Sequence, residues 1–394
     1  MAQLETVTPF ALAHYRKEGY ARQEMDVMAV RATFRWTDDG APLKLAEVQQ
    51  PIRWGETYEG PQDQIQRCVV GSDGDVEIGK PTTDIHVCGH LMAPSGRAQR
   101  DWLSLVRVGD TSKTLRVCGP RQFEKGLTGW SLTRPTPVEQ IRLDYRQAFG
   151  GIQLASQLDE HGHPEYCAFA GNPAGQGWLP DVTDLKPLPK AARQEIEQKI
   201  KAIRQQAAPQ LEDPRAPVSS PFDRQATQGL GPIARWWSPR KERQGTLDEI
   251  WRQYRYPEWP ADFDSHYYNS AHPDLMCRTR LQGDETVTLA NCVVQGATRR
   301  DGDCFLNTQL PGMAVYASAE FEGSDTVQLL EFLLDTVSID LDRQEISMTW
   351  HRLCMPHQSL KWALIGGMPL DLMREIRRKR AAALPVAPPA GAAP

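Results

Sequence analysis

The chain has 394 residues, which fits roughly two or three domains or one large β-rich domain with additions. Hydrophobic residues make up 40% and charged residues 24% of the sequence, a globular composition that excludes wholesale disorder. The 45 basic and 50 acidic residues give a net charge of −5, so we expect no positive field that would attract nucleic acid.

The first strong strand signal lies at residues 25–36. Apolar side chains recur there at every second position, at Met28, Val30, Ala32, Phe34 and Trp36. This period predicts a half-buried strand. Residues 102–108 and 114–118 are two further apolar runs, and the polar segment 109–112 between them predicts that they form a hairpin.

A helical segment interrupts these strands. Residues 190–207 carry Ile196, Ile200 and Ile203 at positions i, i+4 and i+7, with polar side chains around them. The spacing predicts an amphipathic helix with a narrow apolar stripe. The Pro-containing stretch 212–221 that follows is predicted to be a linker.

The C-terminal part of the chain again predicts strands. Residues 285–294 form one apolar run. Residues 337–341 and 346–350 alternate on either side of a turn at 342–344, which predicts a second hairpin. Residues 278–352 are therefore expected to be β-rich, like the first part of the chain.

The chain ends in a short basic segment. Residues 371–380 predict a helix, whose last turn carries Arg377, Arg378, Lys379 and Arg380 and so opposes the helix dipole. The tail from Ala381 holds only Ala, Pro, Leu, Val and Gly, which predicts disorder. The N-terminus has no signal-peptide pattern, and no apolar run approaches the ~20 residues of a membrane span. We therefore expect a cytoplasmic protein without a membrane partner.

Together these signals predict a mainly β (α+β) fold, with antiparallel β-sandwich-like halves, a central helical and aromatic segment and a short C-terminal helix. We divide the chain into an N-terminal β-rich half (1–185), a helical insertion and linker (186–220), an aromatic and C-terminal β-rich half (221–360), and a basic helix with its tail (361–394). The eight cysteines form no CxxC pair, and several lie in apolar runs, so we expect buried free thiols.

Few patterns in the sequence point to a cofactor. His86, Cys88 and His90 would share one face of a strand, where three metal-competent side chains could converge. Gly89 predicts that the strand turns there, and a fourth ligand is not identifiable. We therefore expect no metal and no cofactor, and keep these three residues as the candidate ligands. Residues 74–81 approximate a phosphate-binding loop, but Pro81 stands where that loop needs Ser or Thr.

The densest aromatic region spans residues 229–273 and contains Trp236, Trp237, Trp251 and Trp259. Two functions compete for it. Aromatic platforms with paired carboxylates suit a carbohydrate-binding or glycoside-hydrolysing cleft, for which the candidate carboxylates are Asp248, Glu249, Asp262 and Asp264. Aromatic and arginine side chains also suit a structural or partner-binding hub, which we favour. Thr246 and Glu249 predict a capping box at the start of a short helix.

Several motifs, taken in this order, resemble the bacterial family known as the domain of unknown function numbered 2169. They include Lys80-Pro81-Thr82-Thr83-Asp84, Phe149-Gly150-Gly151, Asn172-Pro173, Gly231-Pro232-Ile233, Trp237-Ser238-Pro239-Arg240, Gly245 to Trp251, Pro260 to Asp264, and Leu310-Pro311-Gly312. The matches span about residues 20–352. The helical segment 190–207 lies between family motifs and looks like an insertion.

The resemblance implies a role beside bacterial type VI secretion. Members of this family are typically encoded near VgrG spike proteins, PAAR tips and toxic effectors, and act as adaptors or chaperones that help load an effector. The resemblance thus implies a non-enzymatic protein without catalytic residues, whose partner is an effector or a PAAR or VgrG protein. Candidate contact residues are Trp236, Trp237, Arg240, Trp251 and Trp259, although the same positions could instead build a core or domain junction. Structural roles are expected for Lys80, Asp84, Gly150, Gly151, Asn172, Pro173, Asp262 and Phe263.

Overall fold

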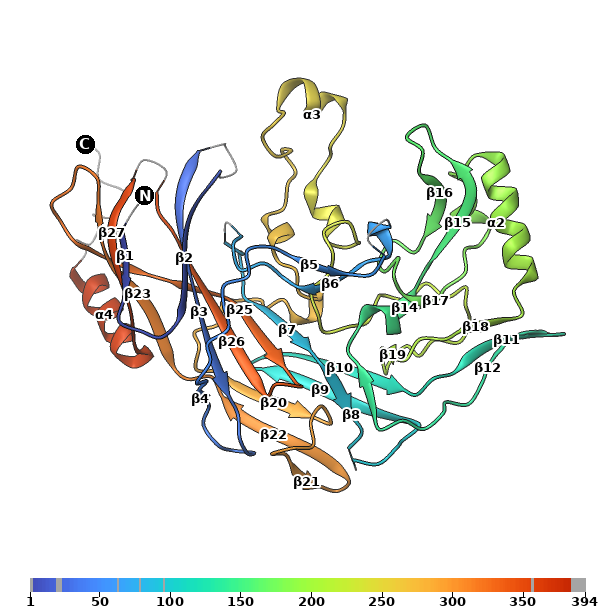
Figure 1. Cartoon of the computed structure of the whole chain (residues 1–394), viewed down its shortest axis with the longest axis horizontal. Coiled ribbons are helices and arrows are strands. Elements are labelled where there is room, and N and C mark those ends of the chain that lie inside the picture. The colour runs from blue at the N-terminus through green and yellow to red at the C-terminus, as the bar shows by residue number, and fades with distance from the viewer. Residues whose placement is uncertain are drawn as a thin grey trace, which may run out of the picture.

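The computed structural model describes residues 3–18, 23–61, 64–77, 79–94, 96–355 and 358–383. The chain is mainly β, as the sequence predicts, with several sheets and few helices (Figure 1). The C-terminal helix expected at 371–380 is α4 (Leu370–Ala383). The rest of the tail predicted to be disordered lies outside the described residues. Within those residues, no helix is long and apolar enough to cross a membrane.

A first six-stranded sheet combines strands from both ends of the chain. Across it lie β2 (Ala11–Glu18), β3 (Glu24–Arg35), β26 (Glu345–Leu353), β25 (Leu333–Asp340) and β7 (Asp84–Cys88), with the short β4 (Lys44–Leu45) paired to β3. Strands β25 and β26 form the hairpin predicted around residues 342–344. Strand β7 pairs with β25 in parallel, whereas the other neighbours in this sheet are antiparallel.

Strand β3 is buried on both faces, whereas its sequence predicted a half-buried strand. Met28 and Val30 lie in the hydrophobic core. On the other face Arg31 is only 2% exposed, because its guanidinium pairs with the carboxylate of Asp75 at 2.6 Å. A charged side chain at an alternating position suggests a solvent-facing side. In the structure the charge of Arg31 is instead compensated by Asp75, which lies in a loop distant in sequence.

A second six-stranded sheet contains, in order, β19 (Leu211–Glu212), β10 (Thr111–Cys118), β9 (Asp101–Val108), β20 (Thr286–Ala290), β22 (Asp303–Gln309) and β21 (Thr298–Arg300). Strands β9 and β10 are the predicted hairpin. Strand β20 ends before residue 294, because Asn291 takes a φ of +53° and turns the chain. In both six-stranded sheets, strands from 1–185 pair with strands from 221–360, so these two ranges do not form separate sheets.

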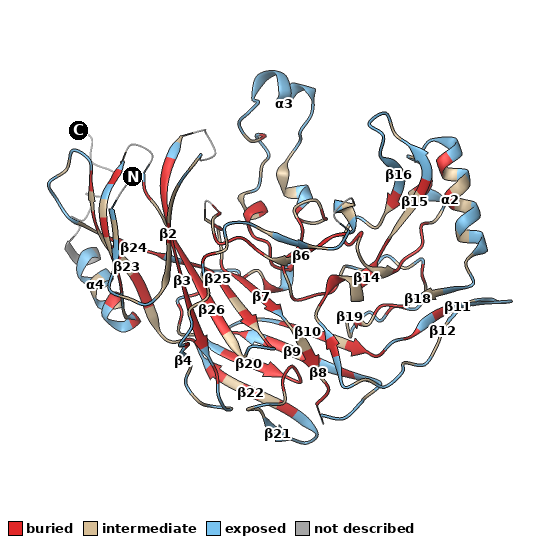
Figure 2. Cartoon of the chain, in the orientation of Figure 1, coloured by how far each residue is buried: buried red, intermediate tan, exposed pale blue. Residues whose placement is uncertain are grey.

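A third sheet contains β1 (Gln3–Thr6), β27 (Leu360–Pro369), β23 (Met313–Phe321) and β24 (Gln328–Glu331). Helix α4 packs on this sheet through Leu370 and Met373. One hydrophobic core runs through all three sheets and includes Val30, Leu289 and Ile365. Figure 2 shows this core as the red, buried stretches of the central strands.

A lobe with its own core lies beside these sheets, on the right of Figure 1. It contains β11 (Gln122–Gly126), β12 (Gly129–Leu132), β14 (Phe149–Gly150), β15 (Ile152–Leu158), β16 (Pro164–Ala168), β17 (Gln176–Gly177), α1 (Val182–Leu185), α2 (Lys190–Ala202) and β18 (Gln205–Ala207). Helix α2 confirms the predicted helix, and its Ile196 is fully buried. The helix ends earlier than predicted, because residues 205–207 pair with β11 as a strand.

The stretch 212–221, predicted to be a linker, is attached to the rest of the protein at Glu212 and at Val218. Glu212 belongs to β19, is 1% exposed and pairs with Arg121. Its carboxylate also accepts a hydrogen bond from the backbone of Val218, which packs in the core of the lobe. The proline-containing composition of residues 212–221 predicted a linker without contacts to the rest of the protein. The buried Glu212 carboxylate instead ties this segment to the lobe.

Two small ribbons and one isolated helix complete the fold. Strands β5 (Thr57–Glu59) and β6 (Val69–Ser72) pair with each other, as do β8 (His90–Met92) and β13 (Gln140–Arg142). Helix α3 (Glu249–Tyr254) projects away from the sheets, at the top of Figure 1. Single 3-10 turns occur at Ile65–Arg67, Tyr145–Gln147, Lys241–Gln244, Ser265–Tyr268 and Pro273–Leu275. All eight cysteines are free, and all except Cys88 are buried.

Candidate functional site

Lys80 lies at the centre of a buried network of charged side chains and is only 2% exposed. Its ammonium lies 2.7 Å from Oδ2 of Asp73, 2.8 Å from Oδ2 of Asp84 and 3.0 Å from the hydroxyl of Thr336. Burial alone would lower the pKa of Lys80, but the two carboxylates raise it above its ordinary value. Burial would likewise raise the pKa of Asp73, but Lys80 holds it well below its usual range. Lys80 is therefore a permanently charged cation inside the protein.

Asn269 and Ser270 contribute further hydrogen bonds to this network. The side-chain amide of Asn269 donates to Oδ1 of Asp84 at 2.9 Å and to the carbonyl of Thr82 at 3.0 Å. The backbone N–H of Ser270 donates to Oδ2 of Asp84 at 2.8 Å, and its hydroxyl donates to Asp73 at 2.5 Å. The Lys80–Asp84 motif is thereby joined to residues almost two hundred positions later. This supports the structural role expected for Lys80 and Asp84.

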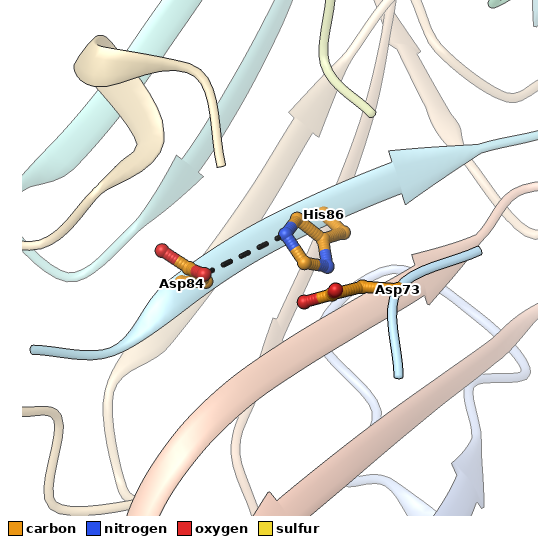
Figure 3. Close-up of side chains that lie close together, drawn as sticks. All are labelled: Asp73, Asp84 and His86. Atoms are coloured by element: carbon orange, nitrogen blue, oxygen red, sulfur yellow. Dashed lines mark ion pairs between the residues drawn. The ribbon is translucent and has the colours of Figure 1, made fainter. Parts of the chain in front are cut away.

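His86 lies on β7 beside the two aspartates (Figure 3). Its Nε2 lies 3.1 Å from the hydroxyl of Ser270 and 3.8 Å from Oδ2 of Asp84. Burial and the nearby Lys80 lower the pKa of His86 to about 4, so the imidazole is neutral at neutral pH. The ligand atoms of Asp73, Asp84 and His86 lie within 4.8 Å of one another.

The candidate ligands His86, Cys88 and His90 do not gather at one point. Strand β7 ends at Cys88, which is exposed, and Gly89 takes a φ of +102°, so the chain turns where the sequence suggested. His90 lies on β8, and its Nδ1 contacts Asp342 at 2.9 Å. The group that does gather, Asp73 with Asp84 and His86, already surrounds the ammonium of Lys80. Repulsion from this fixed charge disfavours a metal ion at the same place.

The Ser270–His86–Asp84 arrangement resembles a hydrolytic triad only in its composition. Nucleophilic catalysis requires a serine hydroxyl that a substrate can reach and that donates to its base. Ser270 is completely buried, and its hydroxyl donates to Asp73 instead. Asp84 lies near Nε2 of His86, the same nitrogen that faces Ser270. In this conformation the arrangement stabilises the fold rather than presenting a nucleophile.

A second buried cluster lies beside the first. The Nδ1 atom of His351 lies 2.8 Å from Oδ2 of Asp335, and Arg280 pairs with the same carboxylate. Burial would lower the pKa of His351, but the neighbouring Asp335 carboxylate outweighs it and raises the pKa above the ordinary value. Arg280 also donates to the backbone carbonyl of Lys80. The two clusters therefore share one loop.

A third cluster contains the arginines of the aromatic motif. Arg240 is 2% exposed and donates to the carbonyl of Tyr267 at 2.9 Å, to that of Ile233 at 2.8 Å and to Glu56 at 3.1 Å. Arg235 pairs with Glu56 at 2.9 Å and with Glu77. These arginines tie the motif to the loops that flank β5 and β6.

The tryptophans of the aromatic motif divide between the core and the surface. Trp237 is fully buried, with its ring edge-on to Tyr145 at a centroid distance of 5.4 Å. Trp236 is half-buried against Tyr58. A side chain without exposed surface cannot contact a partner in this conformation. Of the predicted contact residues, Trp237 and Arg240 therefore build the core.

The glycine-rich motifs surround a single buried amide. The side chain of Asn172 is fully buried and donates to the carbonyl of Tyr145 at 2.7 Å. A Cβ atom on Gly150 would lie 2.1 Å from the carbonyl oxygen of Asn172, so any other residue would clash there. Gly151 and the buried Pro173 adjoin this contact. These contacts support the structural role expected for the four residues.

Residues 246–262, which we call the arm, leave the body of the protein and return to it. Asp262 closes the base, because its carboxylate accepts hydrogen bonds from the backbone of Thr246 at 2.9 and 3.1 Å and from its hydroxyl at 2.7 Å. Trp259 stacks on Phe263 at the base, with ring centroids 4.4 Å apart. Trp251 is half-buried within the arm, and its indole N–H donates to the carbonyl of Glu258 at 2.8 Å.

The tip of the arm exposes apolar and aromatic side chains. Leu247, Ile250, Tyr254 and Tyr256 are 47%, 69%, 74% and 66% exposed. Figure 2 shows most of the arm in the colour of exposed residues. Helix α3 begins after Asp248, whose carboxylate accepts from the backbone of Trp251 at 2.8 Å. The predicted capping box of Thr246 and Glu249 is therefore wrong, because the cap lies two residues later and Thr246 binds Asp262.

The four carboxylates considered for glycoside hydrolysis all have local roles. Asp248 caps α3, Glu249 pairs with Arg252 at 3.1 Å, and Asp262 holds the base of the arm. Asp264 caps the turn Ser265–Tyr268, and its carboxylate also contacts the ring of His266 at 2.8 Å. Hydrogen bonds from Thr246 lower the pKa of Asp262. A glycosidase needs one carboxyl group with a raised pKa, and the shift at Asp262 is in the opposite direction.

Three buried carboxylates, those of Asp73, Asp75 and Glu77, were not among the candidate residues predicted from the sequence. They are 3%, 4% and 5% exposed, and pair with Lys80, Arg31 and Arg235 respectively. Their spacing at every second residue was the available signal, since it places them on one side of an extended segment. Gly74, which lies between the first two and favours a turn, obscured that signal.

Comparison with known proteins places the chain in a family. It belongs to the uncharacterized proteins conserved in bacteria named DUF2169, whose profile matches residues 21–351. Searches of curated proteins and of solved structures found no match. The matched range includes the buried network, the lobe and the arm, whereas α4 begins after it.

Proposed function

We propose that this chain is a non-enzymatic adaptor or chaperone of bacterial type VI secretion. It binds a cognate effector, or a PAAR or VgrG spike component, in the cytoplasm and assists its loading. The role follows from the family resemblance, and membership of that family supports it. The structural observation that carries the proposal is the arm, with its exposed apolar tip.

The arm has the features of a partner-binding element. Its own fold is complete, because Asp248 caps α3 and Trp251 bonds to the returning chain. Ile250 and Tyr254 are therefore exposed on a segment that has its own hydrogen bonds, and not on an irregular loop. Exposed apolar groups that gather on one projection commonly mark an interaction site.

The shape of the arm indicates how a partner would receive it. Ile250 and Tyr254 lie at positions i and i+4 of α3, on one side of the helix, as the anchors of helical ligands do when they bind in a groove. A projecting element fits a concave apolar surface on a folded partner. We accordingly move the proposed contacts from the buried Trp237 and Arg240 to the tip of the arm. Trp251 and Trp259 brace it from within.

The experiment is purification of the tagged chain from its own host, with the neighbouring secretion proteins expressed, and mass spectrometry of what remains bound. We expect the wild-type chain to retain a toxin-like effector together with a PAAR or VgrG protein. The double variant Ile250→Asp with Tyr254→Ser should lose them. The matched control is Leu127→Ser, because Leu127 is a fully exposed apolar side chain at the tip of the β11–β12 hairpin.

Two results would contradict the proposal. In the first, the wild-type chain is recovered alone under these conditions. In the second, the Ile250 and Tyr254 double variant retains the effector as well as the wild type does, which would exclude the arm. Matching circular dichroism spectra of the three proteins would show that altered binding is not altered folding.

A further inference from the structure

The ribbon formed by β15 and β16 has one covered edge and one open edge. Among the described residues, β16 pairs only with β15. Side chains of α2 cover the far side of β15. The carboxylate of Glu195 accepts a hydrogen bond from the N–H of Ser156 at 3.0 Å, and Lys199 donates to the carbonyl of Leu154 at 2.9 Å. In Figure 1, α2 accordingly lies beyond β15, whereas β16 lies on the side towards the arm.

The register of the ribbon shows which backbone groups lie on the open edge. Just after β16, Phe169 donates its N–H to the carbonyl of Gly151, the residue before β15, at 2.9 Å. In an antiparallel pair, residues that bond to the partner strand alternate with residues whose backbone groups point away from it. The N–H and C=O groups of Tyr166 and Ala168 therefore point outward. No described residue forms a hydrogen bond with these four groups.

Both residues are within reach of a second chain. Tyr166 is 41% exposed, and Ala168 is half-buried. Two residues further along the same edge, the carbonyl of Ala170 accepts a hydrogen bond from the N–H of Ser238 at 3.0 Å. A backbone thus already pairs with the edge at Ala170, and the positions before it remain open. An open strand edge is a template for another extended chain.

Two recesses with apolar walls lie next to the open edge. Tyr166 lines a groove of about 290 Å³ together with Ile65 and Leu154. Ala168 and Phe169 line a cavity of about 680 Å³. Side chains of an extended chain alternate between its two sides. A strand bound along β16 can therefore place apolar side chains in both recesses.

The groove also contains a cation that is not paired with a carboxylate. Arg67 lines the groove, is exposed and contacts the side-chain oxygen of Gln64 at 3.2 Å. Among the described residues, no carboxylate forms an ion pair with its guanidinium. An acidic side chain on the bound strand would complement this charge.

We propose that the open edge of β16 binds an extended segment of a partner protein, which adds a strand to the ribbon. The segment's backbone pairs with Tyr166 and Ala168, its apolar side chains enter the groove and the cavity, and an acidic residue faces Arg67. Alternating N–H and C=O groups along an edge match a polypeptide backbone better than a small molecule. This site does not involve the arm, so the inference goes beyond the proposed function.

The test uses the full chain and two fluorescein-labelled peptides that differ at one position. The first, Lys-Thr-Val-Val-Val-Thr-Glu, carries an apolar centre and one acidic end. The second, Lys-Thr-Val-Pro-Val-Thr-Glu, lacks the central N–H. Fluorescence anisotropy should show binding of the first peptide and about tenfold weaker binding of the second, as expected for the loss of one backbone hydrogen bond. This comparison uses the wild-type chain and does not depend on how any variant folds.

A proline substitution tests the edge itself. Ala168→Pro removes the outward N–H but keeps the pairing with β15, because proline is tolerated on an edge strand where the N–H faces away. This variant should bind the first peptide about tenfold more weakly than the wild type does. Ala168→Ser is the matched control, because it keeps the N–H and should bind as the wild type does.

Hydrogen exchange at single-residue resolution locates the bound peptide. In the free chain, the amides of Tyr166 and Ala168 should exchange faster than the amide of Cys167, which faces β15. The first peptide should slow exchange at Tyr166 and Ala168 and leave Cys167 unchanged.

Three outcomes would overturn the inference. One is no binding of the first peptide at about 1 mM, the affinity of a very weak ligand. Another is binding that Ala168→Pro leaves unchanged. The third is slow exchange at Tyr166 and Ala168 that appears without peptide as the chain is concentrated, which would mean that a second copy occupies the edge. The Ile250 and Tyr254 double variant of the arm should bind the peptide normally, so a failure of one site can be told from a failure of the other.

Discussion

Lys80 and Asp84 form an ion pair that is almost completely withdrawn from solvent, with Nζ 2.8 Å from Oδ2 and side chains 2% and 0% exposed. The same ammonium serves Asp73, and Asn269 and Ser270 supply the remaining donors to Asp84. Buried charges are tolerated only when they are paired and hydrogen-bonded. Each member of this network therefore depends on the others.

The first prediction concerns the shared cation. Lys80→Met leaves Asp73 and Asp84 as buried carboxylates without a counter-charge, so the free energy of unfolding should fall by about 3–5 kcal/mol. Urea unfolding followed by circular dichroism measures it. Lys44→Met changes an exposed lysine on the edge strand β4 and should shift stability by less than about 0.5 kcal/mol. Equal midpoints for the two variants would show that the network contributes little.

The second prediction concerns acid stability. The pKa of His86 is about 4 in the folded protein, against about 6.5 for an unfolded chain, so below pH 6.5 protons bind preferentially to the unfolded state. The contribution of His86 is thus fully present above pH 6.5 and is lost as the pH falls towards 4. The loss should amount to about 3 kcal/mol. Urea unfolding across this pH range, with wild type and His86→Gln, measures it, and the variant should lack this part of the slope.

His351 supplies the control for that experiment, because its pKa is shifted in the opposite direction. The folded pKa is raised above the ordinary value by Asp335, so its contribution is fully present below about pH 6.5 and is lost as the pH rises through the folded pKa. His351→Gln should therefore leave the acid slope intact and alter only the neutral-to-alkaline side. An acid slope that disappears in His351→Gln but persists in His86→Gln would contradict both assignments.

The third prediction concerns the base of the arm. Asp262→Ala removes all three hydrogen bonds to Thr246, so the arm should open more often while the body of the protein is unchanged. Hydrogen exchange measured by mass spectrometry should become faster in residues 246–262 and stay the same elsewhere. Asp248→Ala removes only the cap of α3 and should speed exchange within that helix alone. Uniform acceleration across the chain in Asp262→Ala would mean that this residue supports global stability instead.

Local patterns predicted those elements whose side chains repeat regularly and whose turns are marked. The polar segment 109–112 between two apolar runs predicted the β9–β10 hairpin. The alternation of apolar residues on either side of 342–344 predicted β25 and β26. Helix α2 was predicted from its isoleucine spacing, but not its end, because the end depends on residues 205–207 pairing with β11. Tertiary pairing of this kind leaves no local trace in the sequence.

The candidate site was harder to predict, because it depends on distant partners for charged groups. Asp75 is buried where Arg31 on β3 and Thr349 on β26 reach its carboxylate. Glu77 is buried where Arg235 and Lys17 reach its carboxylate. In the sequence each of these residues is an ordinary solvated charge. For the tryptophans, the sequence did not show which side chains are buried. Composition alone could not separate the buried Trp237 from the exposed tip of the arm, since both lie in one aromatic stretch.

The fourth prediction concerns Gly150, where the fold leaves no room for a side chain. Its φ is +157°, and a Cβ there would lie 2.1 Å from the carbonyl oxygen of Asn172 and 2.8 Å from that residue's own Cβ. Asn172 cannot retreat easily, because its buried amide is bonded to the carbonyls of Tyr145 and Phe149. Gly150→Ala should therefore lower the free energy of unfolding by about 3 kcal/mol, the upper range for overpacking.

The control for this prediction is another glycine with open surroundings. A Cβ on Gly55 would have no atom within 4 Å, so Gly55→Ala should be neutral or slightly stabilising, because alanine restricts the unfolded chain. Urea unfolding of both variants beside the wild type gives the comparison. If Gly150→Ala were as stable as Gly55→Ala, the loop at Asn172 would be able to move aside. The close contact between these two family motifs would then not be what holds the lobe together.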